Sequence, residues 1–489
     1  MIFKREETMK KLLLTAALLP LSGMAAAQCA PDYTGVTLNV STQNGPAIAS
    51  ALSAAAEVWE KKTCGEVNVI EFPFGELYPK FLTAMSQGTG DFDVIGFVPA
   101  WLPDFAPFMS SMPAALQEGS NWEDIHPTYR ERLMVWDGEV KSATMDGDMH
   151  MLNLRADLLD NPEEQAAFEA KYGYPLAAPV TWAQYRDQAE FFTRPDQGMY
   201  GTAEAYRRGG QQFWYFFSHA ASYTNNPNNP GSMFFDPETM DAQINNAGWL
   251  RALEEYKAFL AFNPPGALNN GSGDVRPLYA GGTVAMNVDW ADSGVLRATE
   301  GSEGAKGTVR TAMLPGSDEI WNHKTGQWDK FPEVVHSPFL AFGGWQLGVP
   351  GDSKNQEAAW DYVSTVVSPE VSGKAIVTAN SGVNPYRFSH YDNLENWGSV
   401  FTPEEAASYL GAQRASLDAP NVALDLRLPG FFSYTEVLEI ELSKALAGEV
   451  EPQVALDTIA AEWNKMTDDF GRDNQLAAYR ASVGLPPLQ

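Results

Sequence analysis

Strand-like and helix-like segments alternate through the first hundred residues, and this alternation constrains the fold more than any other feature. Residues 36–40, 67–72 and 93–97 are short and rich in Val, Ile and Phe, as β-strands are. Between them, residues 52–59 and 77–85 carry apolar side chains at helical spacing, so each helix buries one face. This β-α-β-α-β opening predicts an α/β fold in which helices flank mixed, mostly parallel sheets.

Ligands of such open sheets bind beyond the carboxyl ends of the strands. Gln43 and Asn44 follow the first predicted strand, whereas Phe97 and Trp101 lie at the end of the third. These four residues are therefore candidate ligand contacts. The length of 489 residues suggests more than one unit, yet no linker or repeat divides the chain. Two lobes that share an interrupted sequence satisfy both facts.

The N-terminus has the pattern of an export signal. Two lysines precede the largely apolar residues 12–21, and residues 25–27 are alanines of the kind that signal peptidase recognises. We therefore expect cleavage after residue 27 and release of a soluble protein into the periplasm. A lipid anchor is not expected, because Cys29 would be the second residue of the mature chain, after Gln28.

Acidic residues greatly outnumber basic ones. The net charge is −29, and loss of the export signal, with four basic and two acidic residues, changes it to −31. Nucleic acids and anionic membrane surfaces bind clusters of Lys and Arg. The chain has no basic run, so we expect neither as a partner.

Only two cysteines occur, Cys29 and Cys64, and both belong to the mature chain. An exported protein meets an oxidising compartment, so we expect these residues to form a disulfide. The bond would close a loop of about 36 residues, which the chain-entropy model values at about 4 kcal/mol. A metal site is not expected here, because no histidine lies near either cysteine.

Five further segments carry a family resemblance. They are residues 90–95 (GDFDVI), 145–158 (MDGDMHMLNLRADL), 279–290 (YAGGTVAMNVDW), 343–360 (GGWQLGVPGDSKNQEAAW) and 382–389 (GVNPYRFS). In this order and spacing they resemble the family-1 extracellular solute-binding proteins of carbohydrate ABC importers, the family that includes maltose-binding protein. The chain departs from the family at Asn153 and Leu154, where the family usually has two tyrosines.

The resemblance implies a periplasmic-binding-protein fold, in which two lobes joined by a three-segment hinge close on a ligand. The crossings between lobes are expected near residues 143–153, 283–290 and 341–346. The expected N-terminal lobe holds residues 28–145 and 288–342, and the expected C-terminal lobe holds 146–287 and 343–489. Insertions at 225–230 and 321–328 would either shape the cleft or lie on the surface.

The resemblance also implies the function of a monomeric protein that delivers a sugar, oligosaccharide, polyol or glycosylated solute to the transmembrane permease of an ABC importer. A chemoreceptor is the alternative destination. A pyranose stacks its apolar face on an aromatic ring and pairs its hydroxyls with polar side chains. The aromatic candidates, each of which could equally belong to the core, are Trp101, Trp214, Trp290, Trp345 and Tyr434.

Polar candidates lie on the matched segments. Asp146 and Asp148 occur at the first expected crossing, Gly344 lies in the GGW string, and Arg387 would either pair with the ligand or tie the lobes together. The two aspartates could also form a turn or part of a calcium loop. Too few oxygen ligands follow for calcium, so we expect them to clasp hydroxyls.

An enzyme is the rival class, because a glycosidase also uses two carboxylates in a sugar-sized cleft. Two aspartates separated by one residue point the same way on a strand and lie close together, which suits a clasp better than an acid/base pair. The sequence has no G-x-S-x-G, H-E-x-x-H or P-loop motif. We therefore expect a binding protein with no catalytic residue, metal or cofactor.

Overall fold

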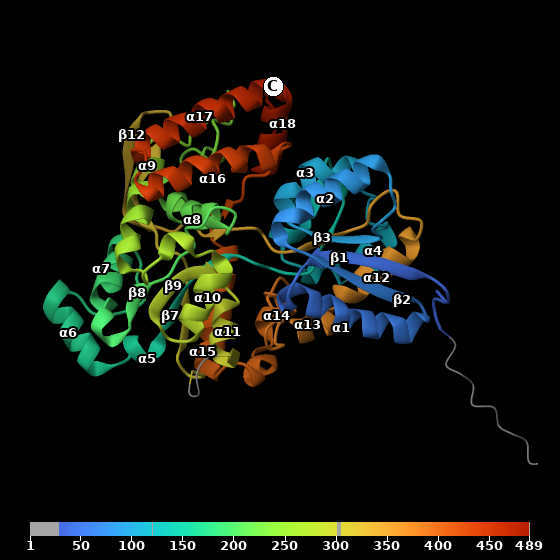
Figure 1. Cartoon of the computed structure of the whole chain (residues 1–489), viewed down its shortest axis with the longest axis horizontal. Coiled ribbons are helices and arrows are strands. Elements are labelled where there is room, and N and C mark those ends of the chain that lie inside the picture. The colour runs from blue at the N-terminus through green and yellow to red at the C-terminus, as the bar shows by residue number, and fades with distance from the viewer. Residues whose placement is uncertain (1–28, 120, 301–304, 489) are drawn as a thin grey trace, which may run out of the picture.

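The computed structural model describes residues 29–119, 121–300 and 305–488. The export signal expected at residues 1–27 lies outside this range. Figure 1 shows two lobes side by side, each with its own sheet covered by helices. The α/β fold with two lobes is therefore confirmed.

The first lobe is built on a five-stranded sheet with the order β2-β1-β3-β14-β6. β1 is parallel to β2 and β3, and β14 is antiparallel to both of its neighbours. The strands are β1 (Thr37–Gln43), β2 (Glu66–Phe72), β3 (Val94–Phe97), β6 (Ala143–Thr144) and β14 (Gln346–Gly348). The first three strands agree with the sequence prediction to within a few residues.

Helices α1 (Pro46–Thr63) and α2 (Phe74–Gln87) follow β1 and β2, as the alternating pattern predicts. α1 buries Trp59, whose Nε1 donates a hydrogen bond to Asp361 Oδ2 (2.8 Å) of helix α12. A segment 302 positions later in the chain thus covers the first lobe. The other helices of this lobe are α3 (Leu102–Phe105), α4 (Ala114–Gly119), α12 (Gln356–Val366), α13 (Pro369–Ala375) and α14 (Phe388–Asp392).

The second lobe holds a four-stranded sheet with the order β10-β7-β9-β8. β7 is antiparallel to β10 and β9, and β8 is parallel to β9. All seven residues of β9 are buried, so this strand forms the centre of the lobe. The strands are β7 (His150–Arg155), β8 (Tyr200–Thr202), β9 (Val284–Trp290) and β10 (Val309–Ala312).

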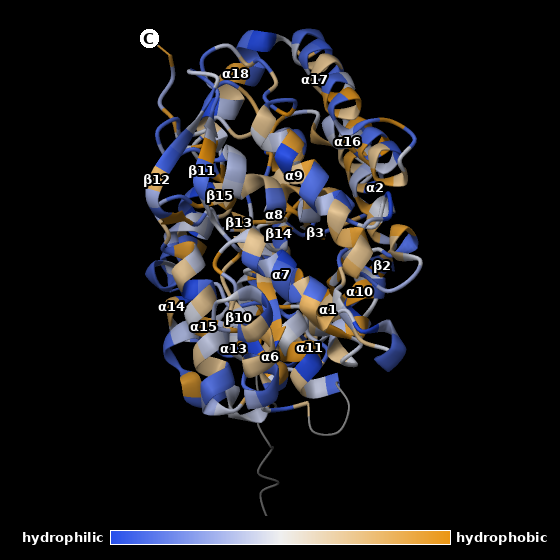
Figure 2. Cartoon of the chain, turned by 90° about the vertical axis from the view of Figure 1, so that its left-hand side faces the viewer, coloured by the Kyte–Doolittle hydropathy of each residue, from blue (hydrophilic) through white to orange (hydrophobic). Residues whose placement is uncertain are grey.

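Helices surround the second sheet, and three C-terminal helices extend the lobe at the top of Figure 1. α17 places Leu456, Ile459 and Trp463 on its buried face, as the spacing predicts. Figure 2 shows the resulting mixture of hydrophilic and hydrophobic residues along α17. The helices are α5 (Ala156–Leu159), α6 (Pro162–Tyr172), α7 (Trp182–Phe192), α8 (Gln212–Thr224), α9 (Ala247–Ala258), α10 (Ser272–Ala280), α11 (Ser293–Glu300), α15 (Pro403–Leu417), α16 (Phe431–Ala447), α17 (Pro452–Asp469) and α18 (Arg472–Ser482).

Strand pairing corrects part of the expected division into lobes. β9 lies wholly within the second sheet, so no crossing occurs at 283–290. β10 pairs with β7, which places residues 309–312 in the second lobe rather than the first. β14 pairs with β3, which places residues 346–348 in the first lobe rather than the second. Hydrogen bonding of edge strands, which the motifs do not encode, decides these positions.

The chain crosses between the lobes from β6 to β7, from β13 (Phe339–Leu340) to β14, and again after α14. The first of these links spans residues 145–149, and the second spans residues 341–345. β13 belongs with the second lobe, where it pairs with β15 (Ala423–Leu424). The first lobe is thus completed by a late segment that begins at β14.

The two insertions pack against each other. Residues 321–328 lie in a hairpin of β11 (Ser317–Asn322) and β12 (Gln327–Val335). Asn226 and Asn228 each donate a side-chain hydrogen bond of 3.0 Å to Asp329 Oδ2 in this hairpin. Neither insertion lines the cavities described below.

The expected disulfide is present between Cys29 and Cys64, whose Cα atoms are 5.9 Å apart. Cys64 follows the last residue of α1, so the bond ties the start of the described chain to the end of that helix. A short two-stranded ribbon of β4 (Val135–Trp136) and β5 (Glu139–Val140) lies before β6. Within the described residues, no helix has the length and apolar character needed to cross a membrane.

Candidate ligand-binding site

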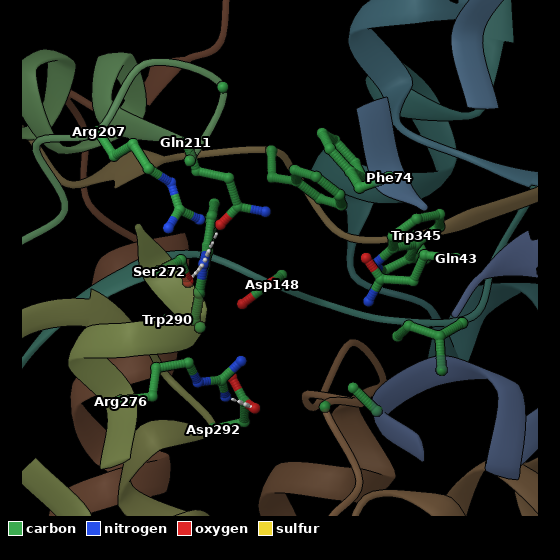
Figure 3. Close-up of a pocket in the computed structure, with 17 residues that line it drawn as sticks. Gln43, Phe74, Asp148, Arg207, Gln211, Ser272, Arg276, Trp290, Asp292 and Trp345 are labelled. Atoms are coloured by element: carbon green, nitrogen blue, oxygen red, sulfur yellow. Dashed lines mark hydrogen bonds and ion pairs between the residues drawn. The ribbon is translucent and has the colours of Figure 1, made fainter. Parts of the chain in front are cut away.

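A cavity of about 270 Å³ lies between the lobes, and we call it the central cavity. Gln43 at the end of β1, Ala47 and Ile48 in α1, and Phe74 in α2 line it from the first lobe. Side chains from the second lobe and from the crossings form the rest of the wall. They are Asp148, Arg207, Gln211, Ser272, Arg276, Trp290, Asp292, Phe342 and Trp345 (Figure 3).

Trp290 ends β9 and forms one wall of the central cavity. Its Nε1 donates to Gln211 Oε1 and to Ser272 Oγ, both at 3.1 Å. The imidazole of His150 packs against its ring with centroids 4.2 Å apart. These contacts hold the indole plane in one orientation, so the cavity presents a pre-formed aromatic surface.

Trp345 lies on the other side of the cavity, at the second crossing (Figure 3). Its ring packs against Phe342 (centroids 5.3 Å) and edge-on against Phe74 (6.1 Å). Its backbone N–H donates to Asp146 Oδ2 at 3.2 Å. The position of this tryptophan therefore depends on the first crossing.

Asp146 and Asp148 join the first crossing to the second crossing and to the segment that precedes α14. Asp146 Oδ1 accepts a hydrogen bond from the backbone N–H of Asn384 (2.7 Å), in addition to the bond from Trp345. Asp148 Oδ1 accepts from Asn384 Nδ2 and from the backbone N–H of Met149, both at 3.1 Å. Asp146 is completely buried and uses both oxygens on the protein, whereas Asp148 lines the central cavity.

Burial dominates the electrostatics of this pair. It raises the pKa of Asp146 to about 7, although two backbone N–H donors favour the charged form. Burial and the neighbouring charge of Asp146 raise the pKa of Asp148 well above its usual value. The Arg276 guanidinium acts in the opposite direction on both carboxyls.

Two arginines add hydrogen-bond donors to the cavity. Arg276 forms an ion pair with Asp292, and Arg207 pairs with Asp274 at 2.9 Å. The Nε of Arg276 is buried and has no hydrogen-bond partner among the described residues. A buried, unpaired donor costs free energy, so it favours an acceptor supplied by a ligand.

The structure brings four of the sequence candidates together at the central cavity: Gln43, Asp148, Trp290 and Trp345. Asn44 lines an adjoining depression that also contains Arg276 and Asp292. Trp101 and Trp214 line a second cavity, which is described below.

The remaining candidates do not line the central cavity, contrary to expectation. Phe97 is fully buried in β3 against Phe105 (5.7 Å). Tyr434 is buried in α16, with its hydroxyl 3.0 Å from Thr467 Oγ1. Both aromatic rings belong to the core, because apolar packing of the helices and sheets requires large side chains there.

Arg387 neither lines the central cavity nor joins the two lobes through its hydrogen bonds. Its buried guanidinium donates to the carbonyl of Val367 and, at 3.3 Å, to that of Asn121, and it pairs with Asp124 at 3.4 Å. All three partners belong to the first lobe. Arg387 thus fastens the segment before α14 to that lobe.

Gly344 allows the first and second crossings to pack closely against each other. Its φ of +80° is a conformation that other residues rarely adopt, and a Cβ there would overlap the backbone carbonyl of Asp146. The GGW string is therefore explained by the close approach of the first and second crossings rather than by ligand contact.

Several cavity residues were not predicted from the sequence. Phe74, Arg207, Gln211, Ser272 and Arg276 lie outside the matched segments, and their polar or aromatic character alone does not distinguish them from surface residues. The Gly209-Gly210 pair beside Gln211 was the available signal, because it marks a turn that can approach a ligand closely.

Two α/β lobes, three crossings and a polar cavity walled by tryptophans define the architecture of a two-lobe binding protein. The model of the bacterial extracellular solute-binding protein family matches residues 41–372, and the chain belongs to this family. The resemblance noted from the sequence motifs is thereby confirmed.

Relatives and solved structures agree with this assignment. A probable amino-acid ABC transporter periplasmic-binding protein of Sinorhizobium fredii is 22% identical over 71% of this chain and 72% of its own length. The mannitol-binding protein of Pseudomonas aeruginosa is 24% identical over 56% of this chain and 55% of its own length. A solute-binding protein of Agrobacterium radiobacter in complex with ribitol has a TM-score of 0.71 at 19% identity, covering 89% of this chain and 100% of the other.

Replacement of Gly344 by alanine should strongly destabilise the protein, because both the backbone conformation and the overlap with Asp146 oppose a Cβ. Gly138 is the matched control, with φ +78° and open space around it. We expect Gly138→Ala to cost about 1–2 kcal/mol and Gly344→Ala to cost at least about 2 kcal/mol more, measured by denaturant unfolding. Equal losses would show that the close approach of the crossings is unimportant.

The raised pKa of Asp146 predicts a pH dependence of stability. The folded state holds its proton up to a pKa of about 7, whereas the unfolded state releases it near 3.8. The free energy of unfolding should therefore fall as pH rises between these values, and this contribution should vanish in Asp146→Asn. Denaturant unfolding at several pH values should show a flatter profile for Asp146→Asn than for the exposed control Asp137→Asn. Identical profiles would contradict the assignment.

Proposed function

We propose that the chain is the periplasmic substrate-binding component of an ABC importer, and that its ligand is a polyol or a sugar. The arrangement of Trp290 and Trp345 on opposite sides of a polar cavity carries this proposal. An indole stacks on the apolar face of a sugar or on the carbon chain of a polyol, and the surrounding polar groups pair with hydroxyls.

The size and polarity of the central cavity support a small hydroxylated ligand. Its volume of about 270 Å³ lies just below the usual range for small-molecule sites, ~300–1,000 Å³. Gln43 approaches from the first lobe, and Asp148, Ser272 and Arg276 approach from the crossing and the second lobe. Such mixed donors and acceptors suit hydroxyl groups, each of which both donates and accepts.

Transport binding is favoured over glycoside hydrolysis by the state of the two aspartates. A glycosidase needs two carboxylates that face the scissile bond. Asp146 is fully buried, and both of its oxygens accept hydrogen bonds from backbone N–H groups of other segments. Asp148 is thus the one member of this pair that lines the cavity, and the other carboxyl there, that of Asp292, is ion-paired with Arg276.

The similarity findings support the ligand class. One relative is a mannitol-binding protein, and one similar structure contains ribitol. Another relative is described as a probable amino-acid transporter component. Membership of the extracellular solute-binding family, together with the expected export signal, supports a periplasmic location and delivery of the ligand to permease subunits.

A ligand screen with the mature protein tests the proposal. D-mannitol, ribitol, neutral sugars and amino acids would be compared by thermal shift, because a ligand of the folded state raises its stability. We expect a polyol or sugar to raise the melting temperature and to make the protein more compact in small-angle scattering, because it contacts both lobes. The ligand should be recovered chemically intact. A response to amino acids alone, or hydrolysis of the bound sugar, would contradict the proposal.

Trp290→Ala should weaken binding of the best ligand by about 1–3 kcal/mol, because the stacking surface is lost. Trp321→Ala in the β11–β12 hairpin is the matched control, since Trp321 lies outside the cavity. Isothermal titration calorimetry would give both affinities, and circular dichroism would establish that both variants fold. If the two variants bound the ligand with equal affinity, Trp290 would be a core residue that does not contact the ligand.

A further inference from the structure

A second cavity of about 410 Å³ adjoins the central cavity, and we call it the aromatic chamber. Phe74, Gly209 and Gln211 line both spaces, so the two are neighbours along the interface between the lobes. The first lobe contributes Tyr78 and Trp101 to the chamber, and the second lobe contributes Phe213, Trp214 and Phe432.

The rings of the chamber come together across the lobes. Tyr78 of α2 stacks on Phe432 of α16 with centroids 5.2 Å apart and planes within 7°. The ring centroid of Phe74 lies 6.2 Å from that of Trp214 in α8 and 5.6 Å from that of Trp101. A guest in the chamber would therefore contact aromatic surfaces from both lobes.

Polar atoms of these walls are already paired within the protein. The Tyr78 hydroxyl donates to Asp104 Oδ2 (2.8 Å), and Trp214 Nε1 donates to Asp425 Oδ2 (2.5 Å). The Thr435 hydroxyl donates to the backbone carbonyl of Phe431 at 3.1 Å. A ligand group bound in the chamber would therefore contact mainly apolar carbon atoms.

Charged groups of the chamber are likewise engaged. Glu439 accepts hydrogen bonds from the backbone N–H of Gly209 at 3.2 and 3.3 Å. Arg208 and Glu436 pair at 3.9 Å, and both side chains are about half exposed. A second pyranose would bury several hydroxyls here with few free partners, which costs free energy. An apolar group has no such cost.

We propose that the aromatic chamber receives an apolar aglycone, while the hydroxylated part of the same ligand occupies the central cavity. This inference rests on the proposed function, because it requires a carbohydrate in the central cavity. The ligand class is then a glycoside with an aryl or short alkyl aglycone. The polar cavity recognises the sugar, and the chamber discriminates among aglycones.

Matched glycosides test the inference. Methyl and phenyl β-D-glucopyranoside, with the corresponding galactoside and mannoside pairs, would be titrated by calorimetry against the mature protein. D-mannitol and the free sugars serve as ligands without an aglycone. We expect at least one phenyl glycoside to bind about tenfold more tightly than its methyl partner, because the ring buries apolar surface against aromatic walls.

A variant locates the effect. Phe432 is 43% exposed, so Phe432→Ala removes a chamber wall without opening the core. Because Phe432 also stacks on Tyr78 of the other lobe, the readout is the ratio of phenyl to methyl glycoside affinity within the same variant, and this ratio should lose most of its phenyl preference. Phe108→Ala, at a residue 37% exposed and outside the chamber, should leave the preference intact.

The outcomes separate the inference from the proposed function. If mannitol or free sugars bind but no phenyl glycoside exceeds its methyl partner, the aglycone inference is wrong and the proposed function stands. If a phenyl preference survives in Phe432→Ala, the chamber is not its source and the inference is again wrong. If no carbohydrate or polyol binds, the proposed function fails and the inference falls with it.

Discussion

The Asp146 carboxylate is the interaction on which the arrangement of the lobes depends. It accepts one hydrogen bond from the segment at Trp345 and another from the segment at Asn384, and its own residue lies on the crossing between β6 and β7. Three stretches of chain that are far apart in sequence therefore meet at one buried acid. Because a buried acceptor pair is costly to leave unsatisfied, this geometry is strongly specified.

The hydrogen bonds around Asp146 also position residues that line the central cavity. The backbone N–H of Trp345 donates a hydrogen bond to Asp146, which fixes the position of Trp345. The side-chain amide of Asn384 donates to Asp148 and fixes that residue in turn. On the opposite side, Trp290 is held by Gln211 and Ser272. Both tryptophans are thus fixed before any ligand arrives, which lowers the entropic cost of binding.

Local periodicity was sufficient to predict the first three strands and the helices between them, because each has one face that must be buried. The family resemblance, rather than periodicity, singled out Trp290 and Trp345, since both lie on matched segments. Neither signal could show that Phe97 and Tyr434 are core residues rather than ligand contacts, because an aromatic residue has the same local signature in a core and in a cleft.

The allocation of β9, β10 and β14 to sheets depends on hydrogen bonds between distant strands, which no local pattern contains. Arg207, Gln211 and Arg276 were missed for a related reason: loop and helix residues become cavity walls only when the lobes are assembled.

The position of β14 has a consequence for the order in which the protein folds. This strand lies between β3 and β6, so β6 has no partner in its sheet until residue 346 is available. The hydrogen bond between Trp59 and Asp361 likewise waits for a segment 302 positions away. The N-terminal third of the chain is therefore not a self-sufficient folding unit. Its sheet and its main helix are completed only after nearly three-quarters of the polypeptide has emerged, and non-local strand pairing of this kind is intrinsically slow to form.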